Sequence, residues 1–297
     1  MKRILITGAT GNIGTEVIHY LYKLDHEAEI ILAVRSIERS KSKFQNYQKL
    51  LFRRFDFEDI QSFDDAFKDI DILFLLRPPH ISDVDKYFQP LLHSAKNNGI
   101  KRVVFLSVQG AEKSKVIPHN KIERLVRSFG FNYIFIRPSY FMQNLTTTLR
   151  SEIVEKQSIT LPSGKAKFNW VDVKNIGEAS AALIKSFDTH QNSIYEITGT
   201  ENKNFQEVTG IINEVAGLNI KFRPINPISF YFSKRRSGVD RGLAMVLTIL
   251  HFLPRIQEEP QISENYFKLT NNEPTTLKEF VSREKDLFLP TSKPIIK

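Results

Sequence analysis

The 297-residue chain contains no cysteine. This absence excludes disulfide bonds, catalysis by a thiol and metal sites built on cysteine. It also fits a reducing compartment, so we expect a cytoplasmic protein. Long apolar runs are missing as well, because the longest one, 243–253, contains Thr248 and His251 and is too short to span a bilayer. Since no signal peptide is visible before the first apolar run, we expect no secretion and no membrane partner.

Two further motifs are absent. No Gly-Lys-Ser/Thr loop occurs, which disfavours phosphoryl transfer. The seven histidines form no pair that has metal-ligand spacing with carboxylates, so we predict no catalytic metal.

Acidic residues are fewer than basic ones, 33 against 42, which gives a formal charge of +9. The basic residues are scattered, and the densest run, Lys234–Arg236, is typical of a solvated surface, so we expect no nucleic-acid partner.

The most informative stretch lies at the start of the chain, in residues 3–14. The apolar run 4–7 predicts a buried strand, a G-x-x-G-x-x-G pattern follows, and apolar residues then recur at helical spacing. The order of strand, glycine turn and helix is the context of a dinucleotide-binding fingerprint. We therefore predict that a pyrophosphate binds at Gly8, Thr10, Gly11, Asn12, Ile13 and Gly14. The alternative is a glycine-rich turn that binds nothing.

A second apolar strand, 29–34, is followed by Arg35 and Ser36. In dinucleotide-binding folds the residue after this strand faces the adenosine ribose: an acidic residue there favours NAD, and an arginine accommodates the 2′-phosphate of NADP. We therefore predict NADP(H) rather than NAD(H), held by Arg35 with help from the Ser36 hydroxyl. The alternative is a solvated arginine at a strand end. Lys41 and Lys43 are candidates to assist at the phosphate, although a helix face in water is favoured for both.

Further strands are expected at 49–57, 71–76, 101–108 and 133–136, with helices between them. This alternation predicts an α/β fold, a doubly wound Rossmann sheet of parallel strands. Residues at the carboxyl ends of the strands are predicted to contact the cofactor: Asp56, Phe57, Leu76, Arg77 and Ser107. Asp56 would bind the adenine amino group with Phe57 beside the ring. Alternatively, Asp56 caps a helix that begins near Asp59.

The alternating pattern loosens beyond residue 140. We predict an NAD(P)-binding domain at 1–140, with 166–199 returning to its sheet. A smaller C-terminal α+β lobe, formed by 141–165 and 200–297, is expected on the substrate side, because ligands in such sheets bind outside the carboxyl ends of the strands. Trp170 is predicted to lie in the core.

Several motifs together resemble the NmrA-like branch of the atypical short-chain dehydrogenase/reductases, over nearly the whole chain. The segments that carry the resemblance are 7–14, 34–36, 105–111, 119–123, 137–144, 168–177 and 274–280. The resemblance implies an NAD(P)H-binding protein. Members of this branch include quinone reductases, and others act as NADP(H) sensors that bind a protein partner.

Hydride-transferring short-chain dehydrogenases usually carry a Tyr-x-x-x-Lys pair, which this chain lacks. His119, four residues before Glu123, stands at the lysine position, and Lys115 stands at the tyrosine position. Alcohol dehydrogenation by the usual route is therefore not expected. A quinone is an easier hydride acceptor, because its reduction depends on proximity and orientation more than on a dedicated acid. His119 is a candidate proton donor or ribose contact, and the alternative is a surface histidine after Pro118.

The segment after the sixth strand should line the nicotinamide pocket. We predict substrate contacts at Ser139, Tyr140 and Phe141, with the two aromatic rings stacking on a flat acceptor, and a catalytic hydrogen bond from Asn144 to a carbonyl oxygen. Packing between the two lobes is the alternative for these side chains. The sequence thus favours an NADPH-dependent oxidoreductase that reduces a quinone or a similar flat small molecule. A non-catalytic NADP(H) sensor is the second hypothesis, and a sugar-nucleotide epimerase is disfavoured by the missing tyrosine.

Overall fold

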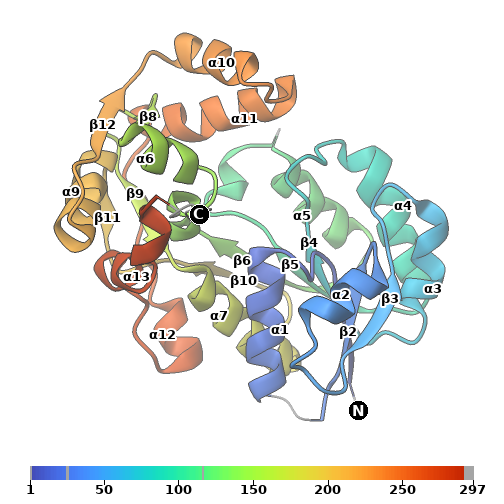
Figure 1. Cartoon of the computed structure of the whole chain (residues 1–297). Coiled ribbons are helices and arrows are strands. Elements are labelled where there is room, and N and C mark those ends of the chain that lie inside the picture. The colour runs from blue at the N-terminus through green and yellow to red at the C-terminus, as the bar shows by residue number, and fades with distance from the viewer. Residues whose placement is uncertain (1, 25–26, 116, 291–297) are drawn as a thin grey trace, which may run out of the picture. The chain divides into compact units, whose positions relative to one another are not determined.

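The computed structural model describes residues 2–24, 27–115 and 117–290. The chain divides into two compact units (Figure 1). Unit 1 comprises Met1–Pro138, Val173–Ile197 and Glu264–Glu273, and unit 2 comprises Ser139–Asp172, Thr198–Ser263 and Pro274–Lys297. Each unit has its own sheet structure, and they are described in turn.

Unit 1 alternates strands and helices along most of its length. Its strands are β1 (Arg3–Ile6), β2 (Glu29–Val34), β3 (Leu51–Arg54), β4 (Ile72–Leu76), β5 (Arg102–Leu106), β6 (Asn132–Pro138) and β10 (Ser193–Ile197). Its helices are α1 (Asn12–Leu24), α2 (Ile37–Lys43), α3 (Phe63–Phe67), α4 (Val84–Asn97), α5 (Pro118–Ser128), α7 (Val173–Lys185), α8 (Phe187–His190) and α12 (Asn265–Thr270), with 3-10 turns η1 (Ile60–Ser62) and η2 (Ala111–Lys113).

The seven strands of unit 1 form one sheet in the order β10-β6-β5-β4-β1-β2-β3, and all neighbouring strands pair in parallel. The order reverses direction between β1 and β4. In doubly wound sheets, ligands bind outside the carboxyl ends of the strands at such a switch point. The predicted α/β Rossmann class is confirmed, and the glycine turn after β1 lies at this switch point.

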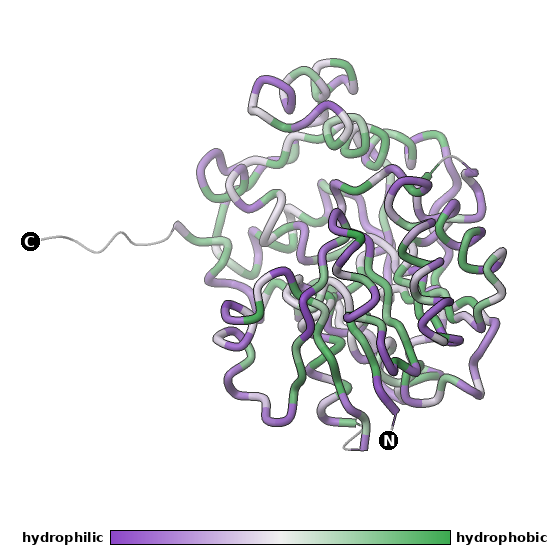
Figure 2. Tube along the Cα trace, turned by 90° about the vertical axis from the view of Figure 1, so that its right-hand side faces the viewer, coloured by the Kyte–Doolittle hydropathy of each residue, from purple (hydrophilic) through white to green (hydrophobic). Residues whose placement is uncertain are grey.

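Both faces of the sheet are covered, which explains why its strands are almost continuously apolar. Alternate residues, such as Leu5, Leu73 and Val103, pack in a cluster with α3, α4 and α5. The other residues of the same strands face the opposite side, where α1 and α7 pack against each other. Figure 2 shows the strands as hydrophobic segments inside a more polar periphery. A Cβ on Gly177 of α7 would lie 2.5 Å from the Glu16 Cβ of α1, so a glycine is required where these helices meet.

Unit 2 is built from short elements. Its strands are β7 (Tyr140–Phe141), β8 (Ser158–Leu161), β9 (Phe168–Val171), β11 (Asn202–Lys203) and β12 (Lys221–Pro224). Its helices are α6 (Arg150–Lys156), α9 (Phe205–Ala216), α10 (Pro227–Arg236), α11 (Arg241–Phe252) and α13 (Leu277–Arg283), with 3-10 turns η3 (Met142–Leu145), η4 (Leu253–Ile256) and η5 (Lys285–Phe288). The strands form a three-stranded sheet, β11-β9-β7, and a two-stranded sheet, β12-β8.

The core of unit 2 is aromatic. Trp170 is fully buried, as the sequence predicts, and packs with Phe168 and Phe205. The range 166–199, which we predicted to return to the large sheet, is divided: β9 lies in the three-stranded sheet of unit 2, and β10 lies in the seven-stranded sheet of unit 1. None of the helices within the described ranges combines the length and apolarity of a bilayer-spanning segment.

Candidate dinucleotide-binding site

The three glycines after β1 are required for three different reasons. Gly8 adopts a left-handed φ of 61°, and a Cβ there would approach Leu76 Cδ2 at 3.0 Å. A Cβ on Gly14 would lie 2.3 Å from the Gly8 carbonyl oxygen, so this position brings α1 close to the turn. A Cβ on Gly11 would meet only the Gly8 oxygen, at 3.3 Å. Gly11 therefore has the fewest close neighbours of the three, as expected where a ligand approaches the backbone.

The N-terminus of α1 presents unpaired backbone donors beside Gly11. Thr15 donates to the Gly11 carbonyl at 3.0 Å, but within the described chain the N–H groups of Asn12, Ile13 and Gly14 have no acceptor. Thr10, Gly11 and Asn12 are exposed, whereas the Ile13 side chain is buried and offers only its backbone. Free N–H groups and the positive end of the helix dipole together favour an anion such as a pyrophosphate.

The Thr7 hydroxyl fixes the turn to the neighbouring strand. It donates to the Phe74 carbonyl at 3.1 Å and accepts from the Leu76 N–H at 2.8 Å. The carboxyl ends of β1 and β4 are thereby held together, with the Leu76 side chain against Gly8. Leu76 thus forms one wall of the turn.

Two basic side chains lie near the end of β2. Arg35 and Ser36 are exposed, and Arg35 makes no hydrogen bond or ion pair with the described part of the chain. Lys43, at the end of α2, donates to the Thr10 carbonyl at 2.6 Å. The sequence suggested that Lys43 belongs to a helix face in water, whereas the structure brings its ammonium to the glycine turn. Spacing along α2 could not reveal this contact, because it depends on how α2 folds back towards β1.

The end of β3 differs from the prediction. Phe57 is only 7% exposed and packs edge-on against Phe55 and beside Phe88, so its ring belongs to the core and is not free to lie beside an adenine. Asp56 is half-buried, and its carboxylate accepts from the Glu58 N–H at 3.1 Å. Asp56 therefore stabilises its own turn, while Asp59 caps η1.

At the end of β4, Arg77 organises the following loop and also contacts His119. One guanidinium nitrogen donates to the carbonyls of Pro78, Pro79 and Ile81, and Nε lies 3.5 Å from His119 Nε2. Since arginine is only a donor, His119 Nε2 must be unprotonated. Burial and the nearby Arg77 charge lower the pKa of His119 to about 3. The imidazole is neutral near pH 7, and the predicted proton-donor role of His119 is not supported.

A buried charge network joins β5, β6 and α5. The Ser107 hydroxyl donates to Glu123 Oε1 at 2.6 Å, and Arg137 donates to both Glu123 oxygens at 2.9 and 2.7 Å and also to Glu112. Ser107, Glu123 and Arg137 are all buried. The only hydroxyl proton of Ser107 is thus engaged within the protein, so the predicted contact of Ser107 with a cofactor would have to use its oxygen as an acceptor. Sequence reasoning missed this network, although a Glu beside apolar Ile122 was a signal for it.

In unit 2, the predicted substrate segment consists mainly of side chains engaged with other residues of the unit. The Ser139 hydroxyl donates to Asn169 Oδ1 at 2.6 Å and is buried. Tyr140 packs against Phe168 and Trp170 with ring centroids 5.2 and 4.9 Å apart, and the Asn144 side chain hydrogen-bonds to Tyr140. Phe141 and Asn144 are half-buried. Ser139 and Tyr140 thus pack inside unit 2, whereas the alternative for this segment is packing between the two lobes.

Tyr140 also forms a hydrogen bond with His251 of α11, 2.9 Å from the Tyr140 hydroxyl to Nε2. His251 Nδ1 lies 2.7 Å from the Leu247 carbonyl, which can only accept. The proton is therefore on Nδ1, and Tyr140 donates to Nε2. Burial lowers the pKa of His251 to about 4 and raises the pKa of Tyr140 above its usual value. Both groups are neutral near pH 7.

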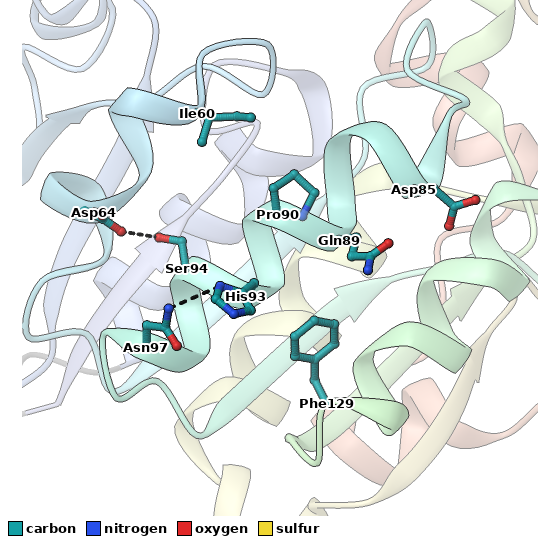
Figure 3. Close-up of a pocket in the computed structure, with 9 residues that line it drawn as sticks. All are labelled: Ile60, Asp64, Asp85, Gln89, Pro90, His93, Ser94, Asn97 and Phe129. Atoms are coloured by element: carbon teal, nitrogen blue, oxygen red, sulfur yellow. Dashed lines mark hydrogen bonds between the residues drawn. The ribbon is translucent and has the colours of Figure 1, made fainter.

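A separate depression of about 510 Å³ lies on the outer side of α4 in unit 1 (Figure 3). It contains Ser94, His93 and Asp64, but the Ser94 hydroxyl donates to Asp64 at 2.5 Å and His93 is bonded to Asn97 at 3.1 Å. Figure 3 shows these as two separate pairs, so His93 is not hydrogen-bonded to the Ser94 hydroxyl and the depression holds no Ser-His pair of the kind that activates a nucleophile.

The parallel sheet and the glycine turn at its switch point define a Rossmann-type protein. Residues 1–281 match the model of the NmrA-like family, and the chain belongs to this family. It is 27% identical to prestalk A differentiation protein A of Dictyostelium discoideum, over 99% of this chain and 96% of that protein. It is also 27% identical to the uncharacterized oxidoreductase YesF of Bacillus subtilis, with 94% of each chain covered.

Other relatives are named for their reactions or ligands. An NAD(P)H azoreductase of Xenophilus azovorans is 24% identical, over 96% of this chain and 99% of that protein. The triphenylmethane reductase of Citrobacter sp., solved with NADP(H), superposes with a TM-score of 0.81 at 25% identity, over 94% of this chain and 99% of that one. The NADPH complex of the Escherichia coli quinone oxidoreductase QOR2 gives a TM-score of 0.81 at 22% identity, with 94% and 99% covered, which shows a shared fold.

Proposed function

We propose that this protein binds NADP(H) and reduces a flat, conjugated small molecule such as a quinone by hydride transfer. The observation that carries the proposal is the glycine turn. Three N–H groups at Asn12–Gly14, which have no acceptor in the described part of the chain, lie beside Gly11, the glycine of the turn with the fewest close neighbours. These donors would hold the pyrophosphate. The bound dinucleotide would supply a hydride, and this chain would bind and orient it.

Preference for the phosphorylated cofactor is supported by charge. Arg35 directly follows β2 and has no partner among the described residues, at a position where an acidic residue would repel a 2′-phosphate. Lys43 adds a second cation next to Thr10. The NADP(H) complex of the triphenylmethane reductase supports the same choice.

The class of substrate is supported by two features. The chain has no Tyr-x-x-x-Lys pair, and His119 is neutral with a pKa of about 3, so a reaction that needs a dedicated protein acid is disfavoured. Hydride addition to a quinone or an azo bond leaves an anion that solvent can protonate, and hydride addition to a cationic triphenylmethane dye gives a neutral product, so neither reaction requires a protein acid. The azoreductase, dye-reductase and quinone-oxidoreductase relatives act on or are named for such acceptors.

Two measurements test the proposal. The parent should oxidise NADPH in the presence of a panel of quinones and azo dyes. Gly11→Val should stay folded by circular dichroism but lose the thermal shift that NADPH gives the parent, because its methyl groups fill the space left for the pyrophosphate. Gly210→Val in α9, where a new Cβ has no neighbour within 4 Å, is the matched control and should keep the shift. A shift of parental size in Gly11→Val would contradict the assignment.

A non-catalytic NADP(H) sensor is the second candidate. It is favoured by the neutral His119 and by the interior hydrogen bonds of Ser139 and Tyr140, because the predicted catalytic and substrate side chains are engaged within the protein. NADPH binding without turnover of any acceptor in the panel would support this function over the reductase.

A further inference from the structure

Helix α11 carries its larger apolar side chains on the outside. Ala244, Thr248 and His251 are buried, and their spacing of four and three residues places them on one helix face. The opposite face is apolar and exposed: Val246 is 51% and Ile249 48% exposed. In an ordinary surface helix the polar residues face the solvent, so the orientation of α11 is inverted.

The exposed apolar residues continue onto the neighbouring elements of unit 2. Helix α10 lies beside α11, and η4 continues directly from the end of α11 (Figure 1; Figure 2). Single exposed apolar residues are common, but a contiguous set indicates a binding surface. We define the α10–α11 apolar face as Ile228, Phe232, Leu243, Met245, Val246, Ile249, Leu250, Leu253 and Ile256.

Basic side chains lie on the same elements as this face. Residues 227–256 contain five of them, Lys234, Arg235, Arg236, Arg241 and Arg255, of which all but Lys234 are exposed. The only acidic residue in this range is Asp240. Its carboxylate caps α11 by accepting from the N–H groups of Gly242 and Leu243 at 2.7 and 3.2 Å. These elements are therefore strongly positive.

The charge of a partner determines whether it can bind next to the basic residues of the α10–α11 apolar face. A second copy of this chain would bring its own arginines against the same basic residues, and like charges in an interface oppose association. An anionic lipid surface satisfies both features, because apolar side chains enter the boundary between headgroups and acyl chains while Lys and Arg contact the headgroups. We propose that the α10–α11 apolar face docks on anionic membrane surfaces. The sequence alone predicted no membrane partner, because it indicates only that no segment spans a bilayer.

Vesicle flotation tests the proposal with the full chain. The parent should bind vesicles of phosphatidylcholine with phosphatidylglycerol, bind pure phosphatidylcholine at least about tenfold more weakly, and lose binding at high salt. Val246→Asp/Ile249→Asp should weaken binding by at least about tenfold, because it places charges at the centre of the apolar face. Arg235→Glu/Arg236→Glu should weaken binding to the anionic vesicles by a similar factor, at about fivefold per lost cation.

Matched controls lie on unit 1. Ile60→Asp/Phe267→Asp alters exposed apolar residues outside the α10–α11 apolar face, and Lys121→Glu/Arg124→Glu makes the same change in net charge on α5. Both controls should keep binding within about twofold of the parent. Absence of vesicle binding by the parent, or an equal loss in the controls, would overturn the proposal. So would a dimer of the parent that Val246→Asp/Ile249→Asp dissociates, because the face would then bind a second copy. Arg235→Glu/Arg236→Glu changes only exposed side chains. If Val246→Asp/Ile249→Asp does not fold, the vesicle binding of the arginine variant tests the proposal.

Discussion

At the scale of single residues, the glycine turn and the end of β2 in unit 1 carry donors that have no partner in the described part of the chain. Arg35 has no partner within the described chain, and the N–H groups of Asn12–Gly14 have no acceptor. Most other polar groups near the strand ends are already engaged: Arg77 with loop carbonyls, Ser107 with Glu123, and Asp56 with its own turn. Residues left without a protein partner are those on which a ligand can act most strongly.

Arg35→Ala should reveal the cofactor preference. The variant should bind NADPH more weakly by about 1.5–3 kcal/mol, the scale of a hydrogen bond to a charged group. NADH, which lacks the 2′-phosphate, should bind with little change. Titration of both cofactors measures this difference, with Arg39→Ala on the exposed side of α2 as the control. Equal losses for the two cofactors would refute the role of Arg35.

His119→Gln should have a small effect on turnover. Glutamine keeps an acceptor for Arg77 and removes the titrating ring. Because the pKa of His119 is about 3, the imidazole is already neutral from pH 5 to 8 and supplies no proton there. We expect less than about a tenfold loss in NADPH oxidation, below the range of a committed general acid. Two results together would show that His119 is the acid after all. The variant would lose a hundredfold or more in the rate of NADPH oxidation, and the rate of the parent would change with pH near pH 6.5.

At the scale of elements, the ends of β5, β6 and α5 depend on one buried ion pair. Glu123→Leu should destabilise the fold by about 3–5 kcal/mol, because it leaves the Arg137 charge buried without its partner. The double variant Glu123→Leu/Arg137→Leu should recover much of this loss. Urea denaturation measures both, and Lys278→Leu, which breaks the exposed pair with Glu214, should cost less than about 1 kcal/mol. A double variant no more stable than the single one would contradict this explanation.

Burial of His251, whose ring is hydrogen-bonded to Tyr140 of β7, makes unit 2 sensitive to acid. The folded pKa of His251 is about 4 and the unfolded value is 6.5, so the unfolded chain binds more protons between these pH values. Stability from this group is therefore present above pH 6.5 and is lost as the pH falls towards 4, by about 2 kcal/mol at pH 5.

His251→Gln keeps an acceptor for the Tyr140 hydroxyl but does not titrate. The loss of stability between pH 7 and pH 5 should shrink by about 2 kcal/mol in this variant, measured by urea denaturation at both pH values. The same change at the exposed His80 serves as the control and should leave the slope as it is in the parent. An unchanged slope in His251→Gln would show that another group causes the acid sensitivity.

At the scale of the whole molecule, the sequence predicts the class of fold well and the role of individual side chains less well. The order of strands and the glycine turn follow from local apolar runs and from Gly8, Gly11 and Gly14, so they could be predicted. The burial of Phe57, the neutral state of His119 and the contact of Lys43 with Thr10 depend on residues far apart in the sequence. Local patterns do not contain this information.

The close approach of α1 to its neighbours has a consequence for the speed of binding. Because Gly14 has no Cβ, α1 can lie close to the turn, and because Gly177 has none, α7 can lie close to α1. The donors at Asn12–Gly14 are therefore held in place before any ligand arrives. A preorganised site needs no opening step, and its association rate is set by diffusion and orientation. In stopped-flow fluorescence, the observed rate at this turn should rise linearly with NADPH concentration and reach no plateau. Gly177→Ala, which forces α7 away from α1, should introduce a slow, concentration-independent phase because the donors must then be reordered for each ligand.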